Sequence, residues 1–189
     1  AWNATMQDTE TRRWLTGKLE SQAVLGSEVI VDEIDGDWAR IVVTAQGTAR
    51  DPRGYPGWVP TAHLVVDEDF AQRAPTSPTA TVTALTSTLS GTRSGNHPGI
   101  DVSFDTILPV LGRTGKAVHV AVPGGRPMYL PAEDVVVRER GEQPPRPTVE
   151  DIIATGERFL GLRYLWAGVS AYGFDCSGYT YTLLRHHGI

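Results

Sequence analysis

The sequence has a single cysteine, no long apolar run and no excess of positive charge, and each shortage excludes a class of protein. Cys176 is the only cysteine among 189 residues, which rules out an internal disulfide framework or a metal site of several cysteines. No stretch approaches the roughly 20 apolar residues of a membrane-spanning helix. The net charge of −5 argues against a nucleic-acid-binding protein, which normally carries a basic face.

The rest of the composition is that of an ordinary globular protein, with 40% hydrophobic and 21% charged residues. Two stretches rich in proline and charge, residues 67–78 and 138–148, lack hydrophobic periodicity and are interpreted as linkers. They divide the chain into an N-terminal helical segment (1–19), two β units (20–67 and 79–137) and a helical segment (148–189).

The first β unit has the pattern of a small antiparallel sheet. Residues 26–34 alternate between apolar and polar types, Asp-Gly-Asp forms a hairpin turn, and residues 38–44 supply the partner strand. Residues 55–66 add a tight turn and a last strand, in which Trp58 is expected to be a core residue. Within residues 1–19, Thr-Glu-Thr-Arg-Arg-Trp-Leu predicts a short helix that packs on this unit.

The second β unit repeats part of the first. Residues 57–66 and 128–137 share an aromatic, an aliphatic, a proline and a closing pair of valines, with Trp58 matching Tyr129 and Pro60 matching Pro131. Each unit of short strands suits a small closed barrel, because closure removes exposed sheet edges. The order of strands, turns and Gly-Trp-Val-Pro resembles bacterial SH3-like domains.

Two helices are predicted after the second linker. Thr148 and Asp151 have the spacing of reciprocal N-terminal caps, and Gly161 is expected to end the first helix. One face of that helix carries the apolar residues Val149, Ile152, Ile153 and Leu160. Asp175 is the expected N-cap of the second helix, which places Cys176 in its first turn.

Cys176 has the local surroundings of a nucleophile. Unpaired N–H groups and the positive end of the helix dipole favour the thiolate, which can attack a carbonyl carbon. The same N–H groups can hold an oxyanion, and the small residues Ser177 and Gly178 leave room for a substrate. The alternative is that Cys176 is a small buried core residue, as free cysteines commonly are.

The histidines do not supply an obvious base for this thiol. His186 and His187 lie about 15 Å along the same helix and are interpreted as residues that complement its C-terminal dipole. His63 and His119 fall in predicted strands and are expected to be structural, and His97 is expected in a loop.

The last 40 or so residues resemble the nucleophile region of the NlpC/P60 family of bacterial cell-wall cysteine peptidases. The family pattern joins a tyrosine–x–tryptophan–glycine–glycine segment to Asp-Cys-Ser-Gly-aromatic at the start of a helix. The matching residues are Tyr164, Trp166, Ala167, Gly168, Asp175, Cys176, Ser177, Gly178 and Tyr179. Ala167 departs from the pattern, because the family usually has glycine there.

This resemblance implies an α+β fold: two small SH3-like β-barrels followed by the N-terminal helical part of a papain-like cysteine peptidase domain. In that family a sheet after the nucleophile helix carries the catalytic histidine and a third polar residue. The sequence ends at Ile189, so we expect a chain truncated after the nucleophile helix, inactive by itself, whose helix exposes its apolar face. No metal or organic cofactor is implied.

Two SH3-like units ahead of such a domain resemble a subgroup that cuts γ-D-glutamyl–diamino acid bonds in peptidoglycan-derived peptides with a free N-terminal L-alanine. By position, Cys176 is the catalytic nucleophile, Tyr164 and Trp166 line the site, and Asp175 and Ser177 contact the substrate's amino end. Tyr55 and Glu20 of the first unit would complete the ammonium pocket, since a carboxylate can select a free amine.

Two other functions fit the same residues. One is a non-catalytic wall-binding protein, with tandem SH3-like domains and a degenerate peptidase domain. The other is a different papain-like enzyme, such as an amidase or an acyltransferase. The partner expected in the favoured reading is a peptidoglycan or muropeptide substrate, bound by a monomer. A free-amine pocket favours cytoplasmic recycling, with a secreted or wall location as the alternative.

Overall fold

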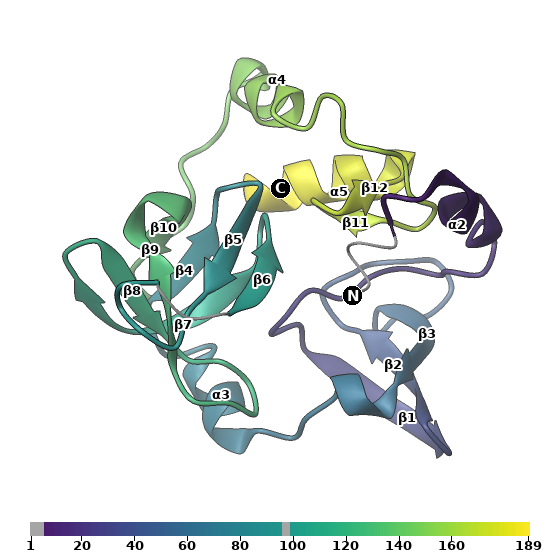
Figure 1. Ribbon diagram of the computed structural model, residues 1–189, viewed down its shortest axis with the longest axis horizontal. Coiled ribbons are helices and arrows are strands. Elements are labelled where there is room, and N and C mark those ends of the chain that lie inside the picture. The colour runs from purple at the N-terminus through teal and green to yellow at the C-terminus, as the bar shows by residue number, and fades with distance from the viewer. Residues whose placement is uncertain (1–5, 96–98) are drawn as a thin grey trace.

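The computed structural model describes residues 6–95 and 99–189, which form small sheets and short helices. Figure 1 shows the two β units side by side beneath α5, with α4 outermost. His97, the expected loop residue, lies outside the described residues.

The first β unit is a three-stranded antiparallel sheet in the order β1 (Val29–Asp35), β2 (Trp38–Val43), β3 (Tyr55–Pro60). The predicted hairpin is confirmed, because Asp35 pairs with Trp38 across a two-residue loop and Gly36 has a φ of +55°. A 3-10 helix, η1 (Thr61–His63), follows β3, so the prediction of a strand at His63 is wrong.

Trp58 is not a core residue. It pairs with Arg40, and both residues lie on the face opposite to the buried row Ala39, Ile41 and Val43. Successive side chains of a strand point to opposite faces, so Trp58 faces outward and half of its surface is exposed (50%).

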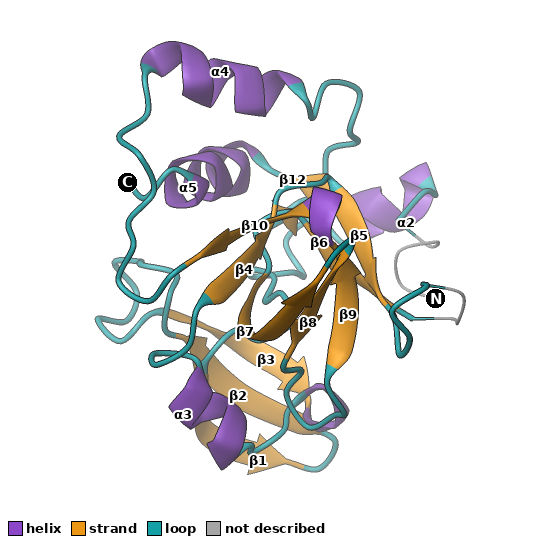
Figure 2. Cartoon of the chain, turned by 90° about the vertical axis from the view of Figure 1, so that its left-hand side faces the viewer, coloured by secondary structure: helices purple, strands orange, loops and turns teal. Residues whose placement is uncertain are grey.

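The second β unit is larger and has its own core. Its strands are β4 (Thr79–Val82), β5 (Thr86–Leu89), β6 (Ile100–Ser103), β7 (Ile107–Thr114), β8 (Ala117–Val120), β9 (Met128–Pro131) and β10 (Val135–Arg138), with η2 (Ala132–Asp134) before β10. Five strands form one sheet in the order β10-β4-β7-β8-β9, and β5 pairs with β6. A bridge between Ser90 and Tyr129 joins the β5 segment to β9 (Figure 2). Leu89, Leu108 and Leu130 are fully buried at the centre.

The expected linker 67–78 contains a helix. Asp67 caps α3 (Glu68–Arg73) by accepting a hydrogen bond from the N–H of Phe70, at 2.9 Å, and it also accepts one from Gly124 at 2.8 Å. Phe70 packs against the core of the second unit. A single apolar residue anchors this segment, which is too little to produce a periodic pattern. The unit boundaries remain predictions.

The N-terminal helix packs elsewhere than predicted. α2 (Thr9–Trp14) lies beside the C-terminal segment, where Met6 and Leu15 bury Leu165 completely. The Arg163 guanidinium donates to the carbonyl of Gln7, which joins the same two segments. The expectation that this helix covers the first β unit is therefore wrong, because its apolar neighbours meet Leu165 instead.

The C-terminal segment contains α4 (Val149–Glu157), β11 (Val169–Ser170), β12 (Gly173–Phe174) and α5 (Cys176–His186). The Thr148–Asp151 capping box is confirmed. α4 ends at Glu157, earlier than predicted, and its apolar residues Val149 and Ile153 are 67% and 55% exposed. Within α5, which is fully described, no large apolar side chain is exposed, so the expected bare apolar face of this helix is wrong.

Candidate functional site

The start of α5 has the geometry expected for a nucleophile. Asp175 is the N-cap: its Oδ1 accepts hydrogen bonds from the Gly178 N–H at 2.6 Å and from the Ser177 hydroxyl at 2.9 Å. Cys176 follows in the first turn, and its side chain is exposed. The thiol is therefore accessible beside the N–H groups of the helix start, and the alternative of a buried core cysteine is wrong.

The glycines of the motif allow two backbone segments to approach each other closely. A Cβ atom at Gly178 would lie 2.0 Å from the Gly168 carbonyl oxygen, and one at Gly168 would lie 2.1 Å from the carbonyl oxygen of Gly173. Real Cβ atoms essentially never lie that close to another heavy atom. A larger residue at Gly178 would therefore push α5 away from Gly168, and one at Gly168 would push apart the two halves of the 168–173 segment.

Asp175 also fixes the segment that carries the motif tryptophan. Its Oδ2 accepts a hydrogen bond from the Ala167 N–H at 3.0 Å, and Ala167 has a φ of +59°, in the left-handed region that favours glycine. The family's glycine at this position is thus explained by the backbone conformation. Ala167 is tolerated there at some cost in strain.

Tyr164 and Trp166 lie on the exposed surface of this segment, 57% and 41% exposed. The Trp166 indole N–H donates to the carbonyl of Leu19 at 3.0 Å. The pKa of Tyr164 is raised, first by partial desolvation of its hydroxyl and then by the negative charges of Asp175 and Cys176. The phenol therefore stays protonated near neutral pH and can donate a hydrogen bond beside the thiol.

Glu20 and Tyr55 meet at a residue that sequence reasoning missed. The Arg50 guanidinium forms an ion pair with Glu20 and lies 5.8 Å from the centre of the Tyr55 ring. Hydrogen bonds with Glu20 and then with Tyr55 raise the pKa of Arg50. Nothing in the pattern around Arg50 distinguishes it from the other surface arginines, because its partner lies 30 residues away.

A series of hydrogen bonds between chain neighbours links the predicted site residues. They run from Asp175 to Ala167, from the neighbouring Trp166 to Leu19, and from the adjacent Glu20 to Arg50. Cys176 and Ser177 are exposed at one end of this series, and Tyr55 is half-buried at the other. Tyr55 and Glu20 therefore belong to the same region as the motif, although the contacts place them beside Arg50.

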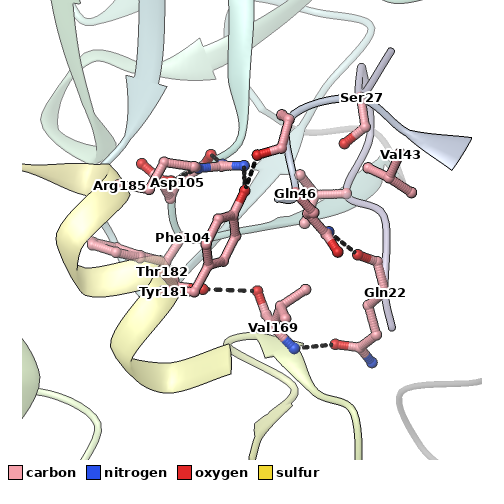
Figure 3. A pocket seen from close by; sticks show the side chains of 12 residues that line it. Gln22, Ser27, Val43, Gln46, Phe104, Asp105, Val169, Tyr181, Thr182 and Arg185 are labelled. Atoms are coloured by element: carbon pink, nitrogen blue, oxygen red, sulfur yellow. Dashed lines mark hydrogen bonds and ion pairs between the residues drawn. The ribbon is translucent and has the colours of Figure 1, made fainter. Parts of the chain in front are cut away.

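A polar interface binds the first β unit to β11 and α5 (Figure 3). The Gln22 Oε1 accepts a hydrogen bond from the Val169 N–H at 3.0 Å, and the Gln22 carbonyl accepts one from Gln46 Nε2 at 2.6 Å. The Tyr181 hydroxyl donates to the carbonyl of Ala45 at 2.8 Å. These contacts hold the segment before β1 against β11 and the loop after β2 against α5, the helix that begins with Cys176.

His186 and His187 lie at the C-terminal end of α5, as predicted, and both contact other side chains. The His186 Nδ1 lies 3.1 Å from Asp105 Oδ1, and the His187 Nε2 lies 3.0 Å from the hydroxyl of Thr155. Both rings are at the opposite end of α5 from Cys176. His119 lies in β8 and stacks on Tyr129, with ring centres 4.5 Å apart.

Residues 6–95 and 99–189 contain neither a candidate metal cluster nor a membrane-spanning helix. No cluster of three or more His, Cys, Asp or Glu side chains in these ranges could hold a metal ion. None of the helices in these ranges has the length and apolar character needed to cross a membrane.

Comparison with known proteins assigns relatives to the whole chain. A family model described as the YKFC SH3b2 domain matches residues 82–137. A crystal structure of an NlpC/P60 family protein from Bacillus cereus superposes with a TM-score of 0.90 and 39% identity, covering 100% of this chain and 62% of that one. The whole chain is therefore similar to part of an NlpC/P60 family protein. The predicted resemblance to that family and the predicted α+β fold class, with SH3-like units ahead of a helical segment, are confirmed.

Two curated relatives of this chain have the same name. A gamma-D-glutamyl-L-lysine dipeptidyl-peptidase from Bacillus cereus is 40% identical over 190 residues, covering 100% of this chain and 56% of the relative. The Bacillus subtilis protein of that name is 32% identical over 170 residues, covering 90% of this chain and 54% of the relative. The chain thus spans little more than half the length of the curated relatives that it matches.

Proposed function

We propose that the protein carrying this chain is a cysteine peptidase that hydrolyses γ-D-glutamyl–diamino acid bonds in peptidoglycan-derived peptides with a free N-terminal L-alanine. The exposed thiol of Cys176, in the first turn of a helix capped by Asp175, carries the proposal. Two relatives whose names specify a gamma-D-glutamyl-L-lysine peptidase support the choice of substrate.

In the proposed reaction the Cys176 thiolate attacks the γ-carbonyl carbon of D-glutamate. The negative charge that develops on the carbonyl oxygen is stabilised by backbone N–H groups at the start of α5, with the Tyr164 hydroxyl as a further donor. The C–N bond then breaks, and the departing amine takes a proton from a histidine of the kind that the family supplies. Water, activated by that histidine, hydrolyses the thioester and regenerates the thiol.

The amino end of the substrate would bind at the surface that joins Asp175 to Glu20. A free α-ammonium group can donate charge-assisted hydrogen bonds to the carboxylates of Asp175 and Glu20, with Ser177 and Tyr55 alongside. Glu20 already faces Arg50, so the substrate's ammonium would share the Glu20 carboxylate with the guanidinium. An N-acylated peptide has no such charge and would bind poorly.

The test measures hydrolysis of L-Ala-γ-D-Glu-L-Lys and of its N-acetyl form by the protein that carries this chain. We expect cleavage of the D-Glu–L-Lys bond in the free-amine peptide alone. Cys176→Ser is expected to lower kcat at least about a thousandfold, because a serine hydroxyl is a far weaker nucleophile than a cysteine thiolate.

A second pair of variants tests the ammonium pocket. Glu20→Gln should lower kcat/KM for the free-amine peptide about tenfold, the worth of one hydrogen bond between charged groups. The matched control is Glu10→Gln, which also removes an exposed carboxylate paired with an arginine, Arg13, and should have no effect. Equal cleavage of the acetylated peptide, or full activity of Cys176→Ser, would refute the proposed function.

A further inference from the structure

The turn between β6 and β7 belongs to the second β unit, yet its residues are buried in the segment that contains α5. Ser103, Phe104 and Asp105 are 3%, 1% and 2% exposed. Turns usually lie on the surface, where water can satisfy their polar groups. This turn instead inserts a hydroxyl, an aromatic ring and a carboxylate into the neighbouring helical segment.

Asp105 makes most of the polar contacts. Its Oδ2 accepts a hydrogen bond from Arg185 Nε at 2.6 Å, and its carbonyl oxygen accepts one from Arg185 Nη2 at 2.7 Å. Figure 3 shows the two side chains facing each other. His186 Nδ1 approaches the other carboxylate oxygen at 3.1 Å. One residue of the β unit therefore holds two consecutive residues in the last turn of α5.

The neighbours of Asp105 in the turn strengthen the same junction. The Ser103 Oγ accepts a hydrogen bond from the Ala171 N–H at 2.9 Å, between β11 and β12. Phe104 belongs to one core with Phe159, Phe174 and Leu183, and its ring centre is 4.4 Å from that of His186. The turn thus completes the core under α5.

Asp105 occupies this place in a backbone conformation that costs energy. Its φ is +62°, in the left-handed region that residues other than glycine rarely adopt. Glycine would satisfy the backbone, but it has no carboxylate to offer Arg185. Burial lowers the pKa of Arg185, but the charge of Asp105 and the contacts with Tyr181 and Asp105 together raise it by more, so the pKa is raised overall. The guanidinium therefore remains charged at this junction.

We propose that Asp105 is a positioning residue for Cys176. It fixes the C-terminal end of α5, while Asp175 and its partners fix the N-terminal end. An 11-residue helix is a rigid rod about 16 Å long, so a shift at Arg185 tilts the axis and displaces the thiol. The second β unit would then contribute to the catalytic region through Asp105. The inference rests on the proposed function.

The test compares Asp105→Asn with Arg113→Gln, which removes an exposed ion pair with Glu139 in the same β unit. In the protein that carries this chain, D105N should lower kcat for L-Ala-γ-D-Glu-L-Lys about tenfold and leave KM within about twofold, because a displaced nucleophile slows the chemical step. Arg113→Gln should leave both unchanged. The assay is run well below the Tm of each variant.

A second variant distinguishes a loss of positioning from a loss of folding. Arg185→Lys keeps the positive charge but loses the two-point contact through Nε and Nη2, and it should lower kcat in the same direction. The double variant D105N/R185Q replaces both charged groups by a pair of amides. Its kcat should be higher than that of D105N alone. A fall in Tm with kcat unchanged in D105N and R185K would show a merely stabilising contact and overturn the inference.

Alkylation of Cys176 by iodoacetamide separates this inference from the proposed function. Cys176 is the only cysteine in this chain, and mass mapping of the peptide that contains it reports the labelling of that thiol. A slower alkylation rate in folded D105N supports the positioning role even if no peptide is hydrolysed. The absence of hydrolysis would contradict only the proposed function. An alkylation rate in D105N equal to that of the wild type, with peptide hydrolysis intact, would contradict only the positioning role.

Discussion

Ala167 occupies a backbone position that favours glycine, and it lies at the centre of the candidate site. Its φ is +59°, its N–H donates to Asp175, and the next residue but one begins β11. The departure from the family pattern was visible in the sequence. The physical consequence is backbone strain at Ala167, and it became visible only from the φ angle in the structure.

Ala167→Gly is expected to stabilise the protein. Removing the Cβ relieves a strain of about 1–2 kcal/mol, and the greater freedom of glycine in the unfolded chain offsets about 0.5–1 kcal/mol of that gain. The net gain in the free energy of unfolding should be up to about 1.5 kcal/mol, measured by urea denaturation.

The matched control is Ala154→Gly, on the exposed surface of α4. The same substitution there should destabilise by about 1 kcal/mol, because glycine is a poor helix former. A loss of stability in A167G similar to that in A154G would contradict the assignment of strain to Ala167.

At the scale of elements, a charged cluster ties β1 to the loop before β3. Arg53 donates to Asp32 of β1 at 2.7 and 2.8 Å and to Asp51 of its own loop at 2.8 Å. These hydrogen bonds lower the pKa of Asp32 and lower that of Asp51 to about 2. The first β unit has only three strands, so its loops contribute to holding the sheet together.

The stability of this unit should therefore depend on pH with a known sign. A carboxyl group whose pKa is lower in the folded state stabilises the fold above its unfolded pKa, about 3.9. That contribution is lost as the pH falls through about 2, the folded value for Asp51. Arg53→Gln should lower the Tm at pH 6.

Thermal unfolding of the wild type and of R53Q across pH 2–7 measures this effect. The two Tm curves should converge as the pH falls below about 4 and approach 2. A difference in Tm that stays constant over the whole range would show that Arg53 acts through packing of its side chain alone.

At the scale of the molecule, Phe104 connects the second β unit to the C-terminal segment. It is 1% exposed, and its ring centre lies 5.1 Å from that of Phe159, in an edge-on arrangement. Phe159 packs in turn on Phe174, which directly precedes the N-cap of α5. Loss of Phe104 would therefore leave a cavity shared by both parts.

Phe104→Ala is expected to cost about 3–5 kcal/mol of stability. Because the cavity is shared, amide hydrogen exchange should speed up in α5 as well as in β6 and β7. Val66→Ala, at a side chain 93% exposed, serves as control and should stay within about 0.5 kcal/mol of the wild type. Faster exchange confined to the β unit would contradict the shared core.

The sequence alone determined the features that depend on residues a few positions apart. These include the Thr148 capping box, the Asp175 cap with Cys176 behind it, and the hairpin at Gly36, because caps and tight turns are closed by neighbouring backbone groups. The motif around Cys176 also identified the family.

Only the tertiary structure decided which distant side chains meet. Arg50 faces Glu20 across 30 residues, Asp105 faces Arg185 across 80, and Trp166 reaches Leu19 across 147. Such pairs leave no periodic pattern in a sequence, because each forms where elements that are distant in the chain pack together and bring polar groups within hydrogen-bonding distance.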